Sequence, residues 1–424
     1  MIERPSALVV RVSGQEVGTL VRLPDRSITF TFSPHYLEDE TRPTISWGFF
    51  DALGRIRARP YRNNPSAPGF FANLIAEGHL RDYTAHRAGL ARDDDFGLLW
   101  VTGTDLPGAV TLEDPEGREL PPPAAGGPED PPPLEDVFRF ALPGVQLKFS
   151  ALNEATGGLT IRAQGDGGDQ IVKLPSTHYD LVPEGEYAML RFASDVGITT
   201  PTMRLIPIDR IHGLPDEARG LKGKALVIDR FDRPTPGKRV HIEDFNQIFK
   251  QQPDQKYDNH SFADIARVIY QAMGNEALID FVQRLVFTVG IANNDMHLKN
   301  WSFIYPDGRT PQLAPAYDYL CTKAYLRHNE TALPLGSARF FPSVTIDQFE
   351  HLAGRAGVSK SVVRAVALEM VARFRERWPK IHDSMPLPAI TETIDEQLAR
   401  VPLFGGQAST IATSGAAKTH EEIS

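Results

Sequence analysis

The sequence of 424 residues contains one cysteine, Cys321, and no uninterrupted apolar stretch long enough to cross a bilayer. A single cysteine excludes an intramolecular disulfide framework and fits a reducing compartment. Residues 1–5 also lack the basic and then apolar pattern of a secretory signal peptide. We therefore expect a cytoplasmic protein without membrane contact.

Positive charge is scarce as well. The chain has 45 Lys and Arg against 54 Asp and Glu, which gives a formal charge of −9 and a pI near 5.8. Binding to nucleic acid depends on basic surface that neutralises phosphates. We therefore expect contact with DNA only indirectly, through a basic partner. The apolar share of 41% is enough for several folded cores.

Composition and periodicity divide the chain into five parts and predict an α+β fold. Strand patterns near the start, separated by turn residues, favour an antiparallel meander, and a helical piece at 68–78 closes this region. The predicted parts are a β-rich N-terminal domain (1–112), an acidic linker rich in Pro and Gly (113–136), a mixed sheet lobe (137–233), a helical lobe (234–404) and a disordered tail (405–424).

Several helix boundaries in the second half can be predicted from capping residues. Ser261 is placed to begin a helix over 262–273, and 276–289 is apolar enough to be a central helix. Thr345 and Gln348 have capping-box spacing. An earlier helix is expected over 184–196.

Three polar residues follow the central helix in a suggestive order. Asp295 and Asn300 are five residues apart, and Asp318 follows a hairpin predicted over 301–314. Phosphoryl transfer needs a carboxylate to take the proton of the attacking hydroxyl, together with an amide and a second carboxylate to hold Mg²⁺ on the ATP phosphates. Loop Asp and Asn residues more often form turns, but this ordered set favours a kinase site.

A cation for the phosphates is expected on the sheet lobe. Lys173 lies in an apolar strand, although a single strand lysine is usually a solvated edge residue. Glu186 or Glu184, on the following helix, is able to form the Lys–Glu ion pair that holds such a lysine against ATP. The segment from Gly144 to Lys148 has neither the kinase glycine-rich pattern nor a Walker pattern. Its amides, with Gln146 or Lys148, remain candidates for phosphate binding.

The charged run Asp229-Arg230-Phe231-Asp232-Arg233 lies where the two lobes join. It can be a salt-bridged turn or a hinge that contacts adenine, and the sequence leaves both open. His297 is expected to order the loop around Asp295 rather than to move protons.

The chain resembles the HipA family of bacterial serine/threonine protein kinases, the toxins of HipA–HipB toxin–antitoxin pairs. The resemblance runs along most of the chain, and its motifs are Glu16-Val17-Gly18-Thr19-Leu20, Phe71-Ala72-Asn73-Leu74-Ile75-Ala76-Glu77-Gly78, Gly144-Val145-Gln146-Leu147-Lys148, Ile171-Val172-Lys173-Leu174-Pro175, Arg230-Phe231-Asp232-Arg233, Asn294-Asp295-Met296-His297-Leu298-Lys299-Asn300 and Leu313-Ala314-Pro315-Ala316-Tyr317-Asp318.

The resemblance implies a two-lobed protein-kinase-like fold and a role for each site residue. Asp295 is the implied catalytic base. The other implied roles are Lys173 and His297 at the ATP phosphates, Asp229 and Phe231 at the adenine hinge, and Asn300 and Asp318 as Mg²⁺ ligands.

The resemblance also implies partners. These are a HipB-like helix-turn-helix antitoxin, which carries the contact with operator DNA, and a protein substrate phosphorylated on Ser; family targets include aminoacyl-tRNA synthetases. One departure is the run Ala141-Leu142-Pro143-Gly144, which lacks the serine that inactivates family members by autophosphorylation. Self-inactivation by that route is not expected here, and Ser150 is a poor substitute.

We therefore predict an ATP- and Mg²⁺-dependent serine/threonine protein kinase. Two alternatives remain open: a metal-dependent phosphoester hydrolase that uses Asp295, His297 and Asp318 as ligands, and a catalytically silent, kinase-shaped scaffold in a repressor complex.

Overall fold

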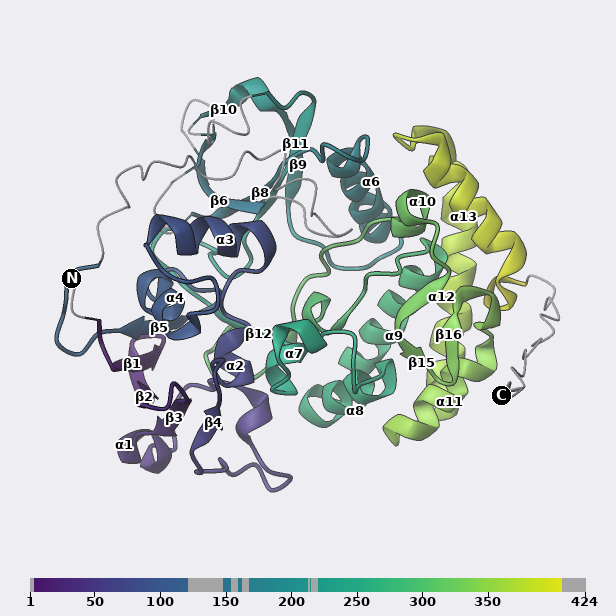
Figure 1. Ribbon diagram of the computed structural model, residues 1–424. Coiled ribbons are helices and arrows are strands. Elements are labelled where there is room, and N and C mark those ends of the chain that lie inside the picture. Colours follow the sequence, from purple (N-terminus) through teal and green to yellow (C-terminus); the bar gives the residue numbers. More distant parts are fainter. Residues whose placement is uncertain are drawn as a thin grey trace, which may run out of the picture.

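The computed structural model describes residues 4–120, 148–153, 159–161, 168–212, 214 and 220–405, with the backbone alone for 148–153 and 159–161. Figure 1 shows a β-rich N-terminal region at the lower left, a sheet-built lobe at the top and a helix-built lobe at the right. The mixed α+β fold with an additional β-sheet domain is as predicted.

The N-terminal region is built on a five-stranded antiparallel sheet in the order β4-β3-β2-β1-β5. Its strands are β1 (Ala7–Val12), β2 (Gln15–Arg22), β3 (Ile28–Phe32), β4 (Tyr61–Asn63) and β5 (Val110–Glu113), and its helices are α1 (Pro34–Glu38), α2 (Gly69–Ala72), α3 (Gly78–Arg87) and α4 (Asp95–Thr102). Leu8, Val10 and Val12 alternate along β1 and are fully buried, which is the period-two pattern of a half-buried strand. The predicted meander is confirmed.

The helix expected at 68–78 is shorter than predicted. Helix α2 ends at Ala72, because Asn73 turns its side chain to the carbonyls of Gly69 (2.7 Å) and Gln251 (2.8 Å). The chain then runs without helix to Gly78, where α3 begins.

The sheet lobe contains six strands in the order β10-β7-β6-β8-β11-β9. They are β6 (Lys148–Asn153), β7 (Leu159–Ile161), β8 (Gln170–Lys173), β9 (Met203–Pro207), β10 (Ile211–His212) and β11 (Lys224–Asp229). Helix α6 (Val182–Asp195) packs on β11 and β9, and it begins two residues before the predicted start. Residues 137–147, the first part of the predicted sheet lobe, lie outside the described ranges.

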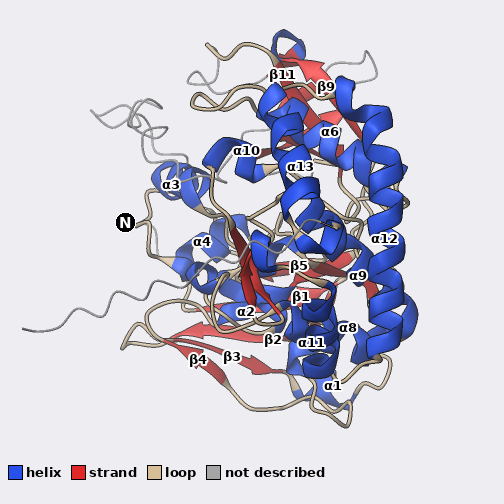
Figure 2. Ribbon diagram, turned by 90° about the vertical axis from the view of Figure 1, so that its right-hand side faces the viewer, coloured by secondary structure: helices blue, strands red, loops and turns tan. Residues whose placement is uncertain are grey.

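The helical lobe is built on the long helices α9 and α12, which pack against each other, with α12 along the outer edge of the molecule in Figure 2. Its helices are α7 (Phe245–Ile248), α8 (Phe262–Met273), α9 (Asn275–Gly290), α10 (Thr322–Leu326), α11 (Ile346–Ala356), α12 (Lys360–Ile381) and α13 (Pro388–Arg400), and its strands are β12 (His241–Asp244), β13 (Ser302–Tyr305), β14 (Gln312–Leu313), β15 (Glu330–Leu335) and β16 (Ala338–Phe340). Of the helices in the described ranges, none has both the length and the apolar character needed to span a bilayer.

Capping predictions in this lobe had mixed outcomes. Ser261 caps α8 as predicted, and Asp264 accepts a hydrogen bond from its backbone N–H (2.9 Å). Helix α11 does begin after Thr345, but the predicted capping box is wrong, because the Thr345 side chain makes no cap hydrogen bond. Gln348 instead accepts from the backbone N–H of Ser337 (2.8 Å) and so holds the β15–β16 turn.

The N-terminal region docks on the helical lobe through close backbone contacts. A Cβ atom at Gly48 would collide with the carbonyl of Ile248, and one at Gly69 would collide with the carbonyl of Lys250. Only glycine permits such an approach. The predicted hairpin is confirmed as β13–β14, and β12 pairs with β13. The loop after α9 is therefore fixed at both ends, by helix α9 before it and by this sheet after it.

Candidate active site

The loop after α9 is held by its own polar side chains. The side chain of Asn293 accepts from the backbone N–H of Asp295 (3.0 Å) and donates to the backbone carbonyl of Asp318 (3.1 Å). Asn293 therefore joins the two segments that carry the predicted carboxylates. No role for Asn293 was predicted from the sequence.

Asn300 lies beside Asp295 as the spacing predicted. Its side-chain nitrogen donates to the backbone carbonyl of Asp295 (2.9 Å), and its side chain is buried. Because the nitrogen is used for this bond, the amide oxygen is the atom that can face a metal. Tyr317, next to Asp318, donates its hydroxyl to the carbonyl of Lys299 (2.9 Å), which brings the hairpin back to the loop.

Lys173 crosses between the lobes. Its ammonium on β8 forms ion pairs with Glu186 of α6 and with Asp318 of the helical lobe. This decides between the two glutamates left open above in favour of Glu186. Burial alone lowers the pKa of Lys173, but the two carboxylates offset this and raise its pKa above the usual value, so it stays a cation. Its 4% exposure rules out a solvated edge lysine.

Asp318 occupies a backbone conformation that non-glycine residues seldom adopt. Its φ is +55°, in the left-handed region. Such conformations cost about 1–3 kcal/mol and persist where the surroundings fix them. The bond from Asn293 to the Asp318 carbonyl and the ion pair with Lys173 are the contacts that do so here.

His297 is buried in the same loop. Burial, with a smaller effect of Lys256, lowers the pKa of His297 to about 3, so the ring is neutral near pH 7. Its Nδ1 has no hydrogen-bond partner among the described residues. A neutral ring that packs edge-on against Tyr257, with centroids 5.0 Å apart, suits an ordering role better than proton transfer.

The charged run at the lobe junction is a salt-bridged turn. Asp232 pairs with Arg230 and Arg233, each at 2.8 Å, and also accepts from the backbone N–H of Gly108 (2.9 Å). Arg233 donates to the carbonyls of Gly108 (2.8 Å) and Leu106 (2.9 Å). The turn therefore fastens the N-terminal region to the base of the sheet lobe.

Asp229 and Phe231 face other partners than this cluster. Asp229 accepts from the side chain of Gln170 (2.8 Å) and is 3.5 Å from Arg204. The ring of Phe231 lies 6.0 Å from that of Tyr317, next to Asp318. Both residues are at the junction, as predicted, while their contact with adenine stays a prediction.

Two of the predicted phosphate ligands cannot be placed. Gln146 lies outside the described residues, and Lys148 is described as backbone on β6 only. The run 141–144 is likewise outside.

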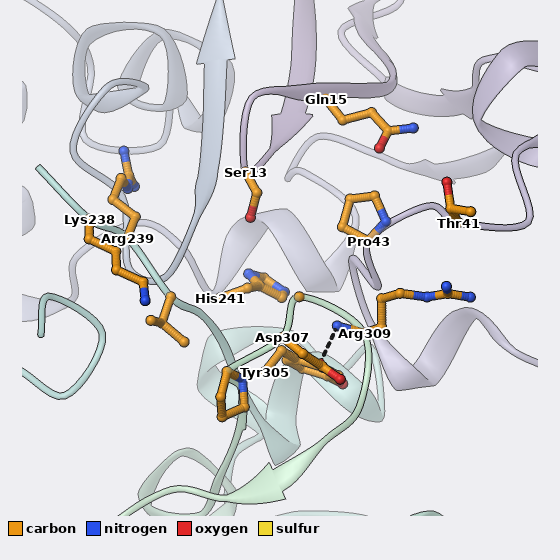
Figure 3. Close-up of a pocket in the computed structure, with 13 residues that line it drawn as sticks. Ser13, Gln15, Thr41, Pro43, Lys238, Arg239, His241, Tyr305, Asp307 and Arg309 are labelled. Carbon is orange, nitrogen blue, oxygen red and sulfur yellow. Dashed lines mark hydrogen bonds between the residues drawn. The ribbon is translucent and has the colours of Figure 1, made fainter.

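A pocket of about 310 Å³ lies away from these residues, between the N-terminal region and the β12–β13 sheet. Figure 3 shows Ser13 and Gln15 on one side of it, with His241 and Arg309 toward the other. Burial lowers the pKa of His241 to about 4, and its Nε2 donates to the carbonyl of Ile45 (2.8 Å). The pocket contains none of the predicted site residues.

Three contacts of the site involve two residues, Tyr257 and Glu77, for which the sequence predicted no role. Tyr257 donates its hydroxyl to the Asp295 carboxylate. Glu77, from the N-terminal region, forms ion pairs with Lys299 and Lys256. These pairs are 38, 222 and 179 residues apart in sequence, and no local pattern marks them.

A sheet lobe with a Lys173–Glu186 pair, linked by the Lys173–Asp318 ion pair to a helix lobe with an Asp-x-x-x-x-Asn loop, defines a two-lobed protein kinase. A family model of the HipA-like C-terminal domain matches residues 140–378, and one of the HipA N-terminal domain matches residues 8–113. The chain belongs to the HipA family of serine/threonine kinases. A protein kinase requires ATP.

Individual relatives agree with this. A Sinorhizobium fredii protein named "Putative kinase Y4dM" is 44% identical over 405 residues, covering 94% of this chain and 98% of its own. The "Serine/threonine-protein kinase toxin HipA" of Shewanella oneidensis is 26% identical over 379 residues, covering 81% and 80%. A solved structure of the S. oneidensis MR-1 HipA, HipB and operator DNA complex matches with a TM-score of 0.69 at 19% identity, over 94% of this chain and 98% of that one.

Proposed function

We propose that this protein transfers the γ-phosphate of ATP, with Mg²⁺, to a serine hydroxyl of a cellular protein. The observation that carries the proposal is the ion pairing of Lys173 with both Glu186 and Asp318, because it places a phosphate-binding cation and a metal-competent carboxylate at one point between the lobes.

The proposed site residues have different roles in the transfer of the phosphoryl group. Asp295 accepts the proton of the attacking serine hydroxyl as the bond to phosphorus forms and the bond to the ADP oxygen breaks. Lys173 neutralises charge on the phosphates. The other proposed phosphate contacts are His297, Gln146 and Lys148, and the proposed adenine contacts are Asp229 and Phe231.

The donor set fits Mg²⁺. This ion takes oxygen ligands and is usually held by one or two carboxylates together with substrate phosphates. Asn300, whose nitrogen is used by Asp295, and Asp318 provide such oxygens. Held by these two residues, the ion would neutralise negative charge on the ATP phosphates.

We also propose a toxin role in the cytoplasm. The S. oneidensis HipA was solved together with HipB and operator DNA. By analogy this chain is neutralised by a HipB-like antitoxin, and it meets DNA only through that partner, in agreement with its formal charge of −9. Aminoacyl-tRNA synthetases are the first candidates for its target, with arrest of translation and growth as the consequence.

The hydrolase alternative is less well supported. Among the described residues, no three His, Cys, Asp or Glu side chains come together as a metal site, so Asp295, His297 and Asp318 do not form a three-ligand centre there. The ion pair between Lys173 and Asp318 suits a nucleotide between two lobes better.

Phosphoproteomics of cells that express the wild type or Asp295→Asn tests the proposal. We expect new phosphoserine peptides with the wild type only, and growth arrest with the wild type only. Equal phosphopeptides in both would contradict the assignment of Asp295. ATP consumption without any phosphorylated protein would favour the hydrolase, and retained arrest by Asp295→Asn would favour the scaffold.

A further inference from the structure

The segment between α2 and α3 belongs to the N-terminal region but is attached to the helical lobe. The side chain of Asn73 donates to the carbonyl of Gln251 (2.8 Å) and accepts from the side chain of Asn246 (2.9 Å). Gly69 lies flat against the backbone at Lys250. The segment is therefore held against residues 246–251. The backbone that leads to Glu77, at the end of the segment, is anchored by these contacts.

Glu77 contacts the catalytic loop, which is the segment after α9 that carries Asp295 and Asn300. Its carboxylate pairs with Lys299, between Asp295 and Asn300, and with Lys256 (3.1 Å). Burial raises the pKa of Glu77, but the two lysines outweigh burial and bring the pKa down to about 2. Glu77 is therefore ionised throughout the physiological pH range.

The same carboxylate is connected to Asp295 by a second route. The backbone carbonyl of Lys256 accepts from the N–H of Leu298 (3.1 Å), inside the loop. Tyr257, the next residue, donates its hydroxyl to Asp295. Burial, together with the Asp295 charge, raises the pKa of Tyr257, so the hydroxyl keeps its proton. Because Tyr257 directly follows Lys256, the ion pair of Glu77 with Lys256 also helps to fix the Tyr257 hydroxyl, which orients Asp295.

We propose that Glu77 is a positioning residue. Through Glu77, the N-terminal domain fixes the catalytic loop and Tyr257 relative to each other, so that Tyr257 stays hydrogen-bonded to Asp295. The proposal rests on the role of Asp295 given above. Without the negative charge, two ammonium groups would face each other at one point of the loop, and their repulsion would displace Lys256 and Lys299. A displacement of about 1 Å at reacting groups can cost on the order of 10²-fold in rate.

The effect is expected on the acceptor side rather than on ATP affinity. The predicted ATP contacts, Lys173 and Asp229, lie on β8 and β11 and have no bond to Glu77. Glu77→Gln is therefore expected to lower kcat by about 10- to 100-fold while the KM for ATP changes by less than about 3-fold. Glu77→Asp, which keeps the charge on a shorter arm, is expected to retain an intermediate kcat.

The experiment measures transfer of labelled phosphate from ATP to casein by the full chain, with melting temperatures of each variant. Thr44→Val is the matched control, because Thr44 also joins the N-terminal region to the helical lobe, through the carbonyl of Arg309 (2.9 Å), without touching the loop. Tyr257→Phe removes one hydroxyl at a partly exposed position and keeps the test informative if Glu77→Gln folds poorly.

The proposal predicts a lower kcat for Glu77→Gln and Tyr257→Phe than for Thr44→Val, at similar melting temperatures. A kcat of both variants equal to that of Thr44→Val, with Asp295→Asn inactive, would overturn the positioning role and leave the kinase assignment intact. Wild-type protein that transfers no phosphate under any condition would overturn both.

Discussion

Lys173 and Asp318, 145 residues apart in sequence, form an ion pair across the two lobes. Glu186 shares the same ammonium, so one buried cation is paired with a helix of the sheet lobe and with the segment after the β13–β14 hairpin. We therefore expect this cation to matter both for the proposed nucleotide site and for the stability of the fold.

Replacing Lys173 by Met should impair the protein in two ways. ATP turnover should fall by about 10²–10³-fold, because a preorganised donor to the phosphates is lost. Stability should fall by about 3 kcal/mol, because the buried Glu186 carboxylate loses its partner. Labelled phosphate transfer and calorimetric unfolding check the two parts.

Lys224→Met is the control for this variant, since Lys224 lies exposed on β11 of the same sheet. It should behave as the wild type in both measurements. Normal ATP turnover by Lys173→Met would remove the lysine from the nucleotide site.

Asn300→Ala should weaken both metal binding and the loop. The variant loses the amide oxygen proposed for Mg²⁺ and the bond to the Asp295 carbonyl. We expect the Mg²⁺ concentration for half-maximal transfer to rise about tenfold or more, as is typical when a metal ligand or its support is lost. An unchanged Mg²⁺ dependence, measured by titration at saturating ATP, would speak against Asn300 as a ligand.

Gly108 is predicted to be a sensitive point of the domain junction. Its φ is +71°, and a Cβ atom would lie 2.7 Å from the backbone nitrogen of Ile242. Gly54 has a similar φ of +72° with no heavy atom within 4 Å of such a Cβ. The left-handed conformation should lower the free energy of unfolding of both alanine variants by about 1 kcal/mol, and the collision should lower that of Gly108→Ala by about 1–3 kcal/mol more. Equal decreases for the two variants in urea unfolding would show that the junction accommodates the Cβ atom.

Glu243 should make stability depend on pH. Burial raises its pKa to about 7, although Ser46, Tyr305 and Trp47 donate to it. The folded state therefore keeps a proton that the unfolded chain, with a pKa near 4.5, has lost. The contribution of Glu243 to the free energy of unfolding should fall by about 3 kcal/mol as pH rises from about 4.5 to about 7, and it should then level off.

Glu243→Gln keeps an acceptor oxygen and removes the titration. In denaturant unfolding between pH 5 and pH 8, the free energy of unfolding of the wild type minus that of this variant should fall up to about pH 7. Both proteins keep the opposing effects of Asp244, whose pKa is raised to about 6 by burial, and of His241, whose pKa is lowered to about 4 by burial. Parallel curves would contradict the role of Glu243.

Local patterns were sufficient for much of the secondary structure and for the proximity of Asp295 and Asn300. Helix α8 follows its cap at Ser261, and the hairpin before Asp318 follows its turn at 307–308, because both depend on neighbouring residues. The spacing of Asp295 and Asn300 likewise depends on one loop. The five-part division of the chain stays a prediction.

Contacts between distant segments could not be predicted in this way. Glu77 and Lys299 are 222 residues apart, and Gly108 and Asp232 are 124 apart, so neither pair has a periodic or capping signal. The false capping box at Thr345 has the same origin, because Gln348 is used by Ser337 in a turn 11 residues away. In these cases, contacts between distant segments determine the structure, and local sequence patterns do not reveal them.

The most direct test of the account is a structure of the protein with Mn²⁺ and a non-hydrolysable ATP analogue, with the metal located by its anomalous scattering. We predict a metal peak between Asn300 and Asp318, with Lys173 at the phosphates and Asp295 facing the γ-phosphate. Nucleotide and metal bound elsewhere, for example in the pocket beside His241, would contradict the central claim.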